Sequence, residues 1–169
     1  MSDLPYSYMI SVADLPPLGL HLKLEPDAET TAALARHIGV LHAEGIVAAL
    51  HLVPEGKEGV RVSGRLTATV RQTCGVTLEP FDAPLDEEID VHFAPAGSYV
   101  RSEEDEENGI DPPDEIVDGR IDVGALLCEF LALGVDPYPR KPGAVFEPPA
   151  EDAAALSPFS ALSRLKDKE

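Results

Sequence analysis

The chain has 169 residues, of which 44% are hydrophobic and none is tryptophan. Its 13 lysines and arginines against 31 aspartates and glutamates give a formal net charge of −18. This charge excludes a protein that simply coats nucleic acid or an anionic membrane, because both attract a basic surface. The length favours one domain over residues 1–169, with a core of Leu, Val, Ile and Ala side chains.

The N-terminal third predicts two strands and one helix. Tyr6–Val12 is short and apolar, and Gly19–Leu24 alternates leucines with polar residues, so both segments are predicted strands. Asp27 can cap the first turn of a helix over Asp27–Ile38, and Gly39 can end it. Met1–Asp14 lacks the features of a signal peptide, and no apolar run is long enough to span a membrane. We therefore expect a cytoplasmic protein without a membrane partner.

The central part of the chain predicts long paired strands. Ile46–Val53 is apolar on both faces, which is typical of a central strand, and 54–59 is a predicted hairpin loop. Gly59–Cys74 keeps a strict alternation of apolar and polar residues, and Asp86–Phe93 alternates in the same way. The connections are too short for crossover helices, so we expect antiparallel neighbours.

The C-terminal part changes in character. Residues 101–119 are acidic and rich in proline, so we expect a mobile acidic loop there. Asp122 caps a predicted helix over Asp122–Leu133 whose apolar residues cover most of its surface. Residues 144–156 are rich in Pro, Ala and acids and are expected to be mobile, and Ser157-Pro158 begins a short C-terminal helix.

These elements predict an α+β fold. We expect a mostly antiparallel sheet, either open or curled toward a barrel, which the N-terminal strands join. Two main helices pack on it, and the short C-terminal helix follows. The expected core comprises Leu22, Leu34, Ile38, Leu50, Val62, Leu66, Val70, Val91, Phe93, Leu127, Phe130 and Leu131.

Three arginines share the polar face of the long strand. Arg61, Arg65 and Arg71 alternate there with serine and threonine, so they could contact phosphate groups of RNA or of a partner. The alternative is a solvated sheet face whose arginines pair with acids on a neighbouring strand. The same two interpretations apply to Arg140 and Lys141.

No catalytic or metal-binding pattern accompanies these residues. Cys74 lies on the apolar side of the long strand without a CxxC motif, and Cys128 lies in the buried helix, so both are interpreted as structural. The five histidines form no metal-ligand spacing, and no nucleotide-binding or nucleophile motif is present. We expect no enzymatic activity, no metal, no cofactor and no small-molecule substrate. The acidic residues most available to a partner are Glu103, Glu104, Asp105, Glu106 and Glu107.

Three segments in order resemble a known family. Gly64–Pro80 resembles the central motif of the YceD family, the large ribosomal RNA subunit accumulation proteins. Ile121–Leu133 followed by Asp136–Gly143 looks like the second motif, and Ser157–Lys166 is similar to the closing one. The resemblance implies a bacterial or organellar protein that is needed for accumulation of 23S rRNA and has no known enzymatic activity.

The resemblance also raises the question of a zinc site. Some family members carry CxxC in the central motif and further Cys or His residues downstream. Here Thr77 occupies the place of the second cysteine, and Asp136–Gly143 supplies no ligand. We expect no metal in this chain, and we expect apolar packing around Cys74 and Val76 to hold the same junction together.

The charge and the resemblance together give a functional hypothesis. RNA repels a chain of this charge at long range, whereas ribosomal proteins are basic and are attracted to it. We therefore interpret the chain as a non-enzymatic assembly factor that contacts a basic ribosomal protein or the assembling large subunit, with rRNA affected indirectly. The alternative is direct rRNA binding through Arg61, Arg65 and Arg71.

Overall fold

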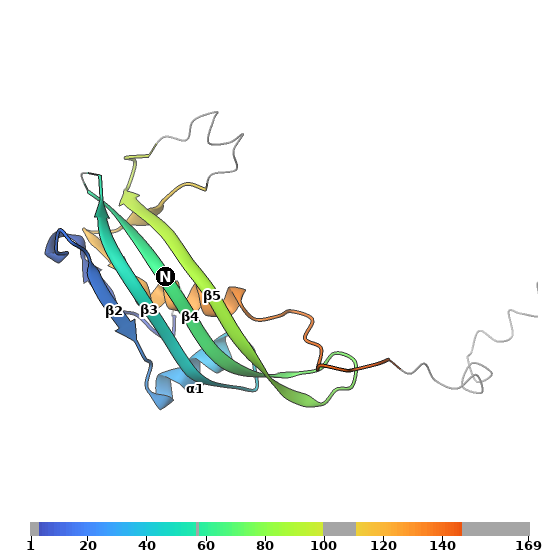
Figure 1. Ribbon diagram of the computed structural model, residues 1–169. Helices are drawn as coiled ribbons and strands as arrows, with labels where there is room; N and C mark the ends of the chain where they lie inside the picture. Colours follow the sequence, from blue (N-terminus) through green and yellow to red (C-terminus); the bar gives the residue numbers. More distant parts are fainter. Residues whose placement is uncertain (1–3, 57, 100–110, 147–169) are drawn as a thin grey trace, which may run out of the picture.

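A five-stranded sheet forms one layer of the molecule, and two helices form the other (Figure 1). The computed structural model describes residues 4–56, 58–99 and 111–146. The strands of the sheet follow the order β2-β3-β4-β5-β6, and β1 pairs with β7 as a separate two-stranded ribbon. In the view of Figure 1 both helices lie behind the sheet.

The elements follow one another in this order: β1 Met9–Ser11, a 3₁₀ turn at Val12–Asp14, β2 Leu20–Leu24, α1 Ala28–His37, β3 His42–Glu55, β4 Gly59–Thr73, β5 Pro80–Pro95, β6 Asp114–Ile116, β7 Arg120–Asp122 and α3 Val123–Leu133. The fold is therefore α+β with mostly antiparallel strands, as predicted. The two main predicted helices and the long strand lie where the sequence patterns indicated.

The alternation of β4 divides the sheet into an inner and an outer face. Its apolar side chains point to the helices and are buried, including Val60, Val62 and Leu66 at 0% exposure. Gly64 is required in the middle of this strand, since a Cβ atom there would lie 2.1 Å from the carbonyl oxygen of Ala49 on β3. The close approach of β3 and β4 at this point leaves no space for any other residue.

Both helices begin at aspartate caps. The Asp27 carboxylate accepts a hydrogen bond from the Thr30 amide at 2.8 Å, which satisfies one of the free N–H groups of the first turn. Asp122 does the same for α3, accepting from the amides of Gly124 and Ala125 at 3.0 Å each. The capping predictions for both helices are confirmed.

Asp122 also fixes the N-terminal ribbon to α3. Its carboxylate accepts hydrogen bonds from the Tyr8 amide at 2.8 Å and the Ser7 hydroxyl at 2.6 Å. Burial raises the pKa of Asp122, but the bonds from Ser7, Tyr8, Ala125 and Gly124 outweigh it, so the pKa lies below its ordinary value. A Cβ atom on Gly124 would lie 2.4 Å from the Tyr8 nitrogen, so only glycine permits this approach.

One continuous core joins the sheet to the helices. Leu34, Leu50, Val62, Leu66, Val70, Phe93, Leu127 and Leu131 of the predicted core are buried. Leu22, Ile38, Val91 and Phe130 are only partly buried and pack against the margin of this core. Leu22 lies on the edge strand β2, Ile38 is the C-cap residue of α1, and Phe130 lies on α3.

The structure corrects three details of the prediction. The sheet is open, with β2 and β6 at the edges of the described part, so the barrel alternative is wrong. The predicted strand Tyr6–Val12 contributes only Met9–Ser11, and this strand pairs with β7 instead of joining the main sheet. Residues 114–116, expected to belong to a loop, form β6, because Ile116 is buried beside the end of β5. β6 pairs with β5 in parallel after a long connection, and the other neighbours in the sheet are antiparallel, as predicted.

Other predictions fall on residues outside the described part. They are the C-terminal helix from Ser157, most of the segment 144–156, and residues 101–110 of the acidic loop.

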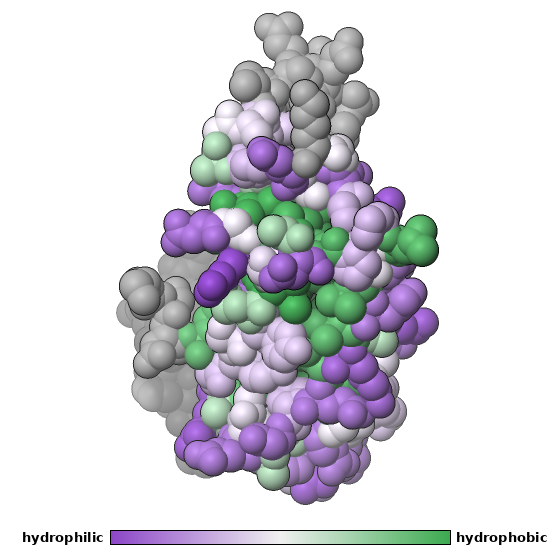
Figure 2. Space-filling model, turned by 90° about the vertical axis from the view of Figure 1, so that its left-hand side faces the viewer, coloured by the Kyte–Doolittle hydropathy of each residue, from purple (hydrophilic) through white to green (hydrophobic). Residues whose placement is uncertain are grey.

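The core reaches the surface at the β2 edge. Figure 2 views the molecule from this side and shows a band of apolar side chains between polar margins. Leu20 and Leu22 of β2 are among the partly buried residues that pack against the core. Among the described residues, no helix is long and apolar enough to cross a membrane.

Leu127 provides a test of the helix–sheet core. The residue is fully buried on α3, so Leu127→Ala should lower the free energy of unfolding by about 2–5 kcal/mol. Leu133, on the same helix, is 76% exposed, and Leu133→Ala should change the free energy of unfolding by less than about 0.5 kcal/mol. Urea denaturation measures both values, and equal losses in the two variants would mean that the buried face of α3 is misassigned.

Candidate functional site

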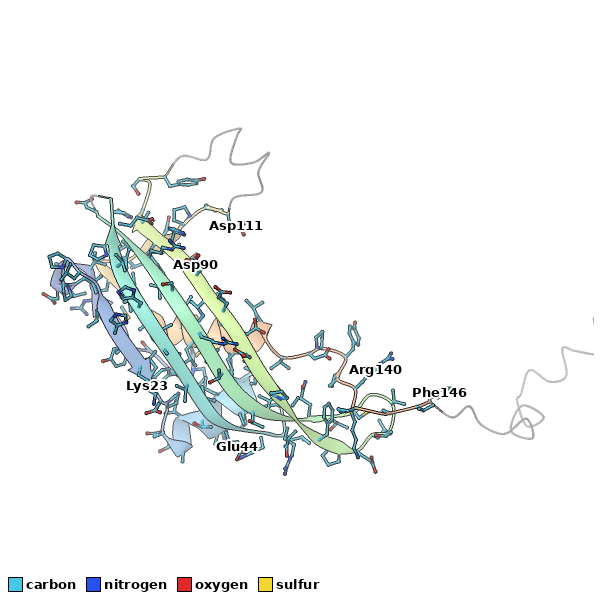
Figure 3. All side chains as sticks on the ribbon, in the orientation of Figure 1. Lys23, Glu44, Asp90, Asp111, Arg140 and Phe146 are labelled. Carbon is cyan, nitrogen blue, oxygen red and sulfur yellow. The ribbon has the colours of Figure 1, made fainter. Side chains whose placement is uncertain are left out.

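The three arginines on the outer face of β4 are brought together with aspartates of β5. The strand alternation turns both sets to the same exposed face. The antiparallel register sets Arg71 directly opposite Asp82, whereas Arg61 and Arg65 reach diagonally to aspartates two positions from the residues opposite them. We call these three pairs the arginine ladder: Arg61–Asp90, Arg65–Asp86 and Arg71–Asp82. Figure 3 shows the side chains of this face and labels Asp90.

Each pair of the ladder is bidentate. Arg61 donates from Nε to Asp90 Oδ1 at 2.8 Å and from Nη2 to Oδ2 at 2.7 Å. Arg71 donates to Asp82 in the same way at 2.7 and 2.8 Å, and Arg65 donates two bonds to Asp86. A fork of this kind satisfies the guanidinium edge that would otherwise receive a phosphate.

The ladder carries no net charge. Hydrogen bonds from the arginines lower the pKa of Asp82, Asp86 and Asp90, so all three carboxyls remain ionised at neutral pH. The same bonds raise the pKa of each arginine. Of the two interpretations of this face, the geometry matches the one in which the arginines pair with acids on a neighbouring strand.

Arg140 and Lys141 lie away from the ladder, in the segment that follows α3. Figure 3 labels Arg140 at the end of the sheet opposite Asp111. The Lys141 ammonium pairs with Glu79 at 2.9 Å, whereas Arg140 has no charged partner among the residues described. The predicted acidic contacts Glu103, Glu104, Asp105, Glu106 and Glu107 lie outside the described residues.

Cys74 organises the turn between β4 and β5. Its Sγ atom accepts hydrogen bonds from the amides of Val76 at 3.4 Å, Thr77 at 3.5 Å and Lys141 at 3.3 Å. The Gly75 amide donates to the Pro139 carbonyl at 2.9 Å. The sulfur thus connects this turn to the segment after α3.

The junction is polar where apolar packing was predicted. Cys74 is buried, as expected, but Val76 is only partly buried. The contacts that hold the two segments are hydrogen bonds to sulfur, the Lys141–Glu79 ion pair, and the bond from Gln72 Nε2 to the Asp136 carbonyl at 2.9 Å. The prediction of apolar packing was wrong because the second segment approaches Cys74 through the Lys141 amide and Glu79 through the Lys141 ammonium, and both groups are polar.

These residues do not fit a zinc ion. Zinc requires several thiolate, imidazole or carboxylate ligands around one point. Within the described ranges, no group of three or more such side chains could hold a metal. Backbone amides occupy the positions around Cys74 Sγ, and an N–H group cannot ligate a cation.

The two cysteines have opposite acid–base properties. Bonds from the Thr77 hydroxyl, the Thr77 amide and the Lys141 amide lower the pKa of Cys74 from 9.0 to about 6. Burial raises the pKa of Cys128, which lies in α3. At neutral pH, Cys74 is therefore mainly a thiolate and Cys128 a neutral thiol.

A pocket that the sequence patterns did not indicate lies at the other end of the sheet. It measures about 570 Å³ and lies where the β3–β4 turn meets the end of β5. Glu55, Glu58 and Asp111 contribute carboxylates to its lining, and Phe93 and Pro113 contribute apolar surface. The residues come from three distant segments, so no local motif could have found them.

The Cys74 turn predicts a pH effect. The thiolate absorbance of Cys128→Ser should rise near pH 6, and Cys74→Ser should show no such rise below pH 9. Folding lowers this pKa, so the thiolate contributes stability that is fully present above the ordinary value of 9.0. That contribution is lost as the pH falls through about 6. A Cys74 transition that stays near its ordinary value would contradict the hydrogen-bonding pattern.

Comparisons with known proteins add one positive finding. No curated protein and no solved structure matches the chain. A family model described as "Large ribosomal RNA subunit accumulation protein YceD" matches residues 62–166. The match covers more than half of the chain and includes β4 from Val62 onward, β5, the Cys74 turn and α3. The chain therefore belongs to the YceD family.

Proposed function

We propose that this chain is a non-enzymatic assembly factor of the large ribosomal subunit that supports 23S rRNA accumulation by binding a basic ribosomal protein. Membership of the YceD family supports the link to large-subunit rRNA accumulation. The arginine ladder is the observation that carries the choice of partner. Its three guanidinium groups are all engaged by carboxylates of the same chain.

The ladder argues for a protein partner over bare RNA. A phosphate group would have to displace Asp82, Asp86 or Asp90 from a bidentate contact and leave that carboxylate facing the RNA. The chain as a whole carries −18, so the remaining field repels polyanions and attracts polycations. A basic ribosomal protein does not have to displace these aspartates, and the net negative charge of the chain attracts it. This function places the protein in the cytoplasm, where ribosomes assemble, without a membrane or small-molecule ligand.

Capture of large-subunit components tests the proposed partner. Tagged protein should retain basic ribosomal proteins at low salt and release them at high salt, because exposed ion pairs are screened. Nuclease treatment of the lysate should leave this retention unchanged. Cross-linking in cells, with separate identification of protein and RNA, measures the same contact. Tight capture of protein-free rRNA at physiological ionic strength would refute the proposal.

The alternative is direct rRNA binding through Arg61, Arg65 and Arg71, and a charge-neutral variant separates the two functions. Replacing the three arginines and their three aspartates by alanine leaves the net charge at −18, since three charges of each sign are lost. Under the proposed function, RNA affinity stays at the wild-type level. Under direct binding, affinity falls and the slope of log affinity against log salt falls by about 3. Filter binding with rRNA fragments at several salt concentrations measures both.

A further inference from the structure

The pocket at the β3–β4 end of the sheet has an apolar floor. Phe93 is 8% exposed and lies at the end of β5. Pro95 and Pro113 lie beside it in the lining. A cavity of about 570 Å³ is large enough for one or two long side chains of a protein, and falls in the size range of ordinary ligand sites.

The charged groups of the pocket are predominantly acidic. Glu55, Glu58 and Asp111 line it, and the described lining includes no lysine or arginine. Glu55 is paired with His92 Nδ1 at 2.6 Å. Glu58 and Asp111 are exposed and have no partner among the described residues. Two carboxylates are therefore available to a cation that enters the pocket. Figure 3 labels Asp111 near the end of the sheet where β5 finishes.

An apolar floor with an acidic rim matches the chemistry of arginine and lysine. Both side chains carry an apolar stem and a cationic head, so the stem can cover Phe93 and the prolines while the head reaches Glu58 or Asp111. A polynucleotide does not match, since its phosphates would face carboxylates. The charge complementarity thus selects a basic protein segment.

We propose that this pocket is where the chain holds its client, by taking an arginine or lysine side chain and an adjacent apolar residue from a segment of a basic ribosomal protein. The proposal rests on the proposed function and adds the place and mode of contact. It uses described residues alone, and it separates the client site from the arginine ladder on the outer face of the sheet.

Two labelled octapeptides probe the pocket directly. One alternates arginine with leucine and the other alternates arginine with serine, so they have the same charge and differ in apolar content. The arginine–leucine peptide should bind the wild-type chain, and the arginine–serine peptide should bind at least about tenfold more weakly. Fluorescence anisotropy measures both affinities.

Two pocket variants and one matched control identify the site. Glu58→Gln with Asp111→Asn removes the two available carboxylates and should weaken arginine–leucine binding by about tenfold or more. Ser98→Arg places a cation in the lining and should weaken it as well. Glu29→Gln with Glu88→Gln changes the net charge by the same two units at exposed positions outside this lining, and should stay within about twofold of wild type. Thermal unfolding verifies that every variant is folded.

The same proteins are then offered the total protein extracted from purified large subunits and, separately, an rRNA fragment. Loss of client capture in both pocket variants, but not in the control, supports the pocket. If the wild type and the pocket variants capture ribosomal proteins equally, the pocket proposal is overturned and the proposed function stands. If the wild type captures no ribosomal protein and binds neither peptide, both fail. Binding of the rRNA fragment that is lost in the pocket variants also overturns the proposal.

Discussion

The pairing of β4 with β5 determines both faces of this molecule. One strand alternates buried aliphatic residues with arginines, and the other alternates buried or partly buried apolar residues with aspartates. The register places the two charged rows together. A shift of one residue would expose the apolar row and bury the arginines, which is far too costly. The ladder and the core are therefore consequences of the same register.

An element of this fold could be predicted from the sequence where its pattern extends over many neighbouring residues. β4 and α3 were predictable because each buries one face over many residues, which leaves a clear period in the sequence. β6 was not, since it has three residues and its only buried one is Ile116. The ribbon of β1 with β7 joins residues more than a hundred positions apart, as in the pairing of Ile10 with Ile121, and no local pattern encodes that contact.

In the candidate sites too, local patterns could be predicted and contacts between distant segments could not. The sequence placed Arg61, Arg65 and Arg71 on one face and left their partners open. The register then selected aspartates that lie 29, 21 and 11 positions further along the chain. The sequence patterns indicate only two roles for Cys74, a metal ligand or a packed apolar group. Its actual partners are backbone amides, which carry no residue-specific signal. The pocket combines Glu55, Phe93 and Asp111 from separate segments, so it emerges only from the fold.

The family motifs now have physical explanations in this chain. Gly64 permits the close approach of β3, and Cys74 Sγ accepts hydrogen bonds from three backbone amides. Asp122 and Gly124 join the N-terminal ribbon to α3. These roles concern the geometry of the fold and need no reacting group. Under the proposed function, recognition then falls to exposed carboxylates such as Glu58 and Asp111, where contacts with a basic client form quickly and are screened by salt. An assembly factor has to release its client to the ribosome. Contacts at an open, solvated rim permit that release more readily than a deeply buried interface would, because rRNA can compete for the same cations.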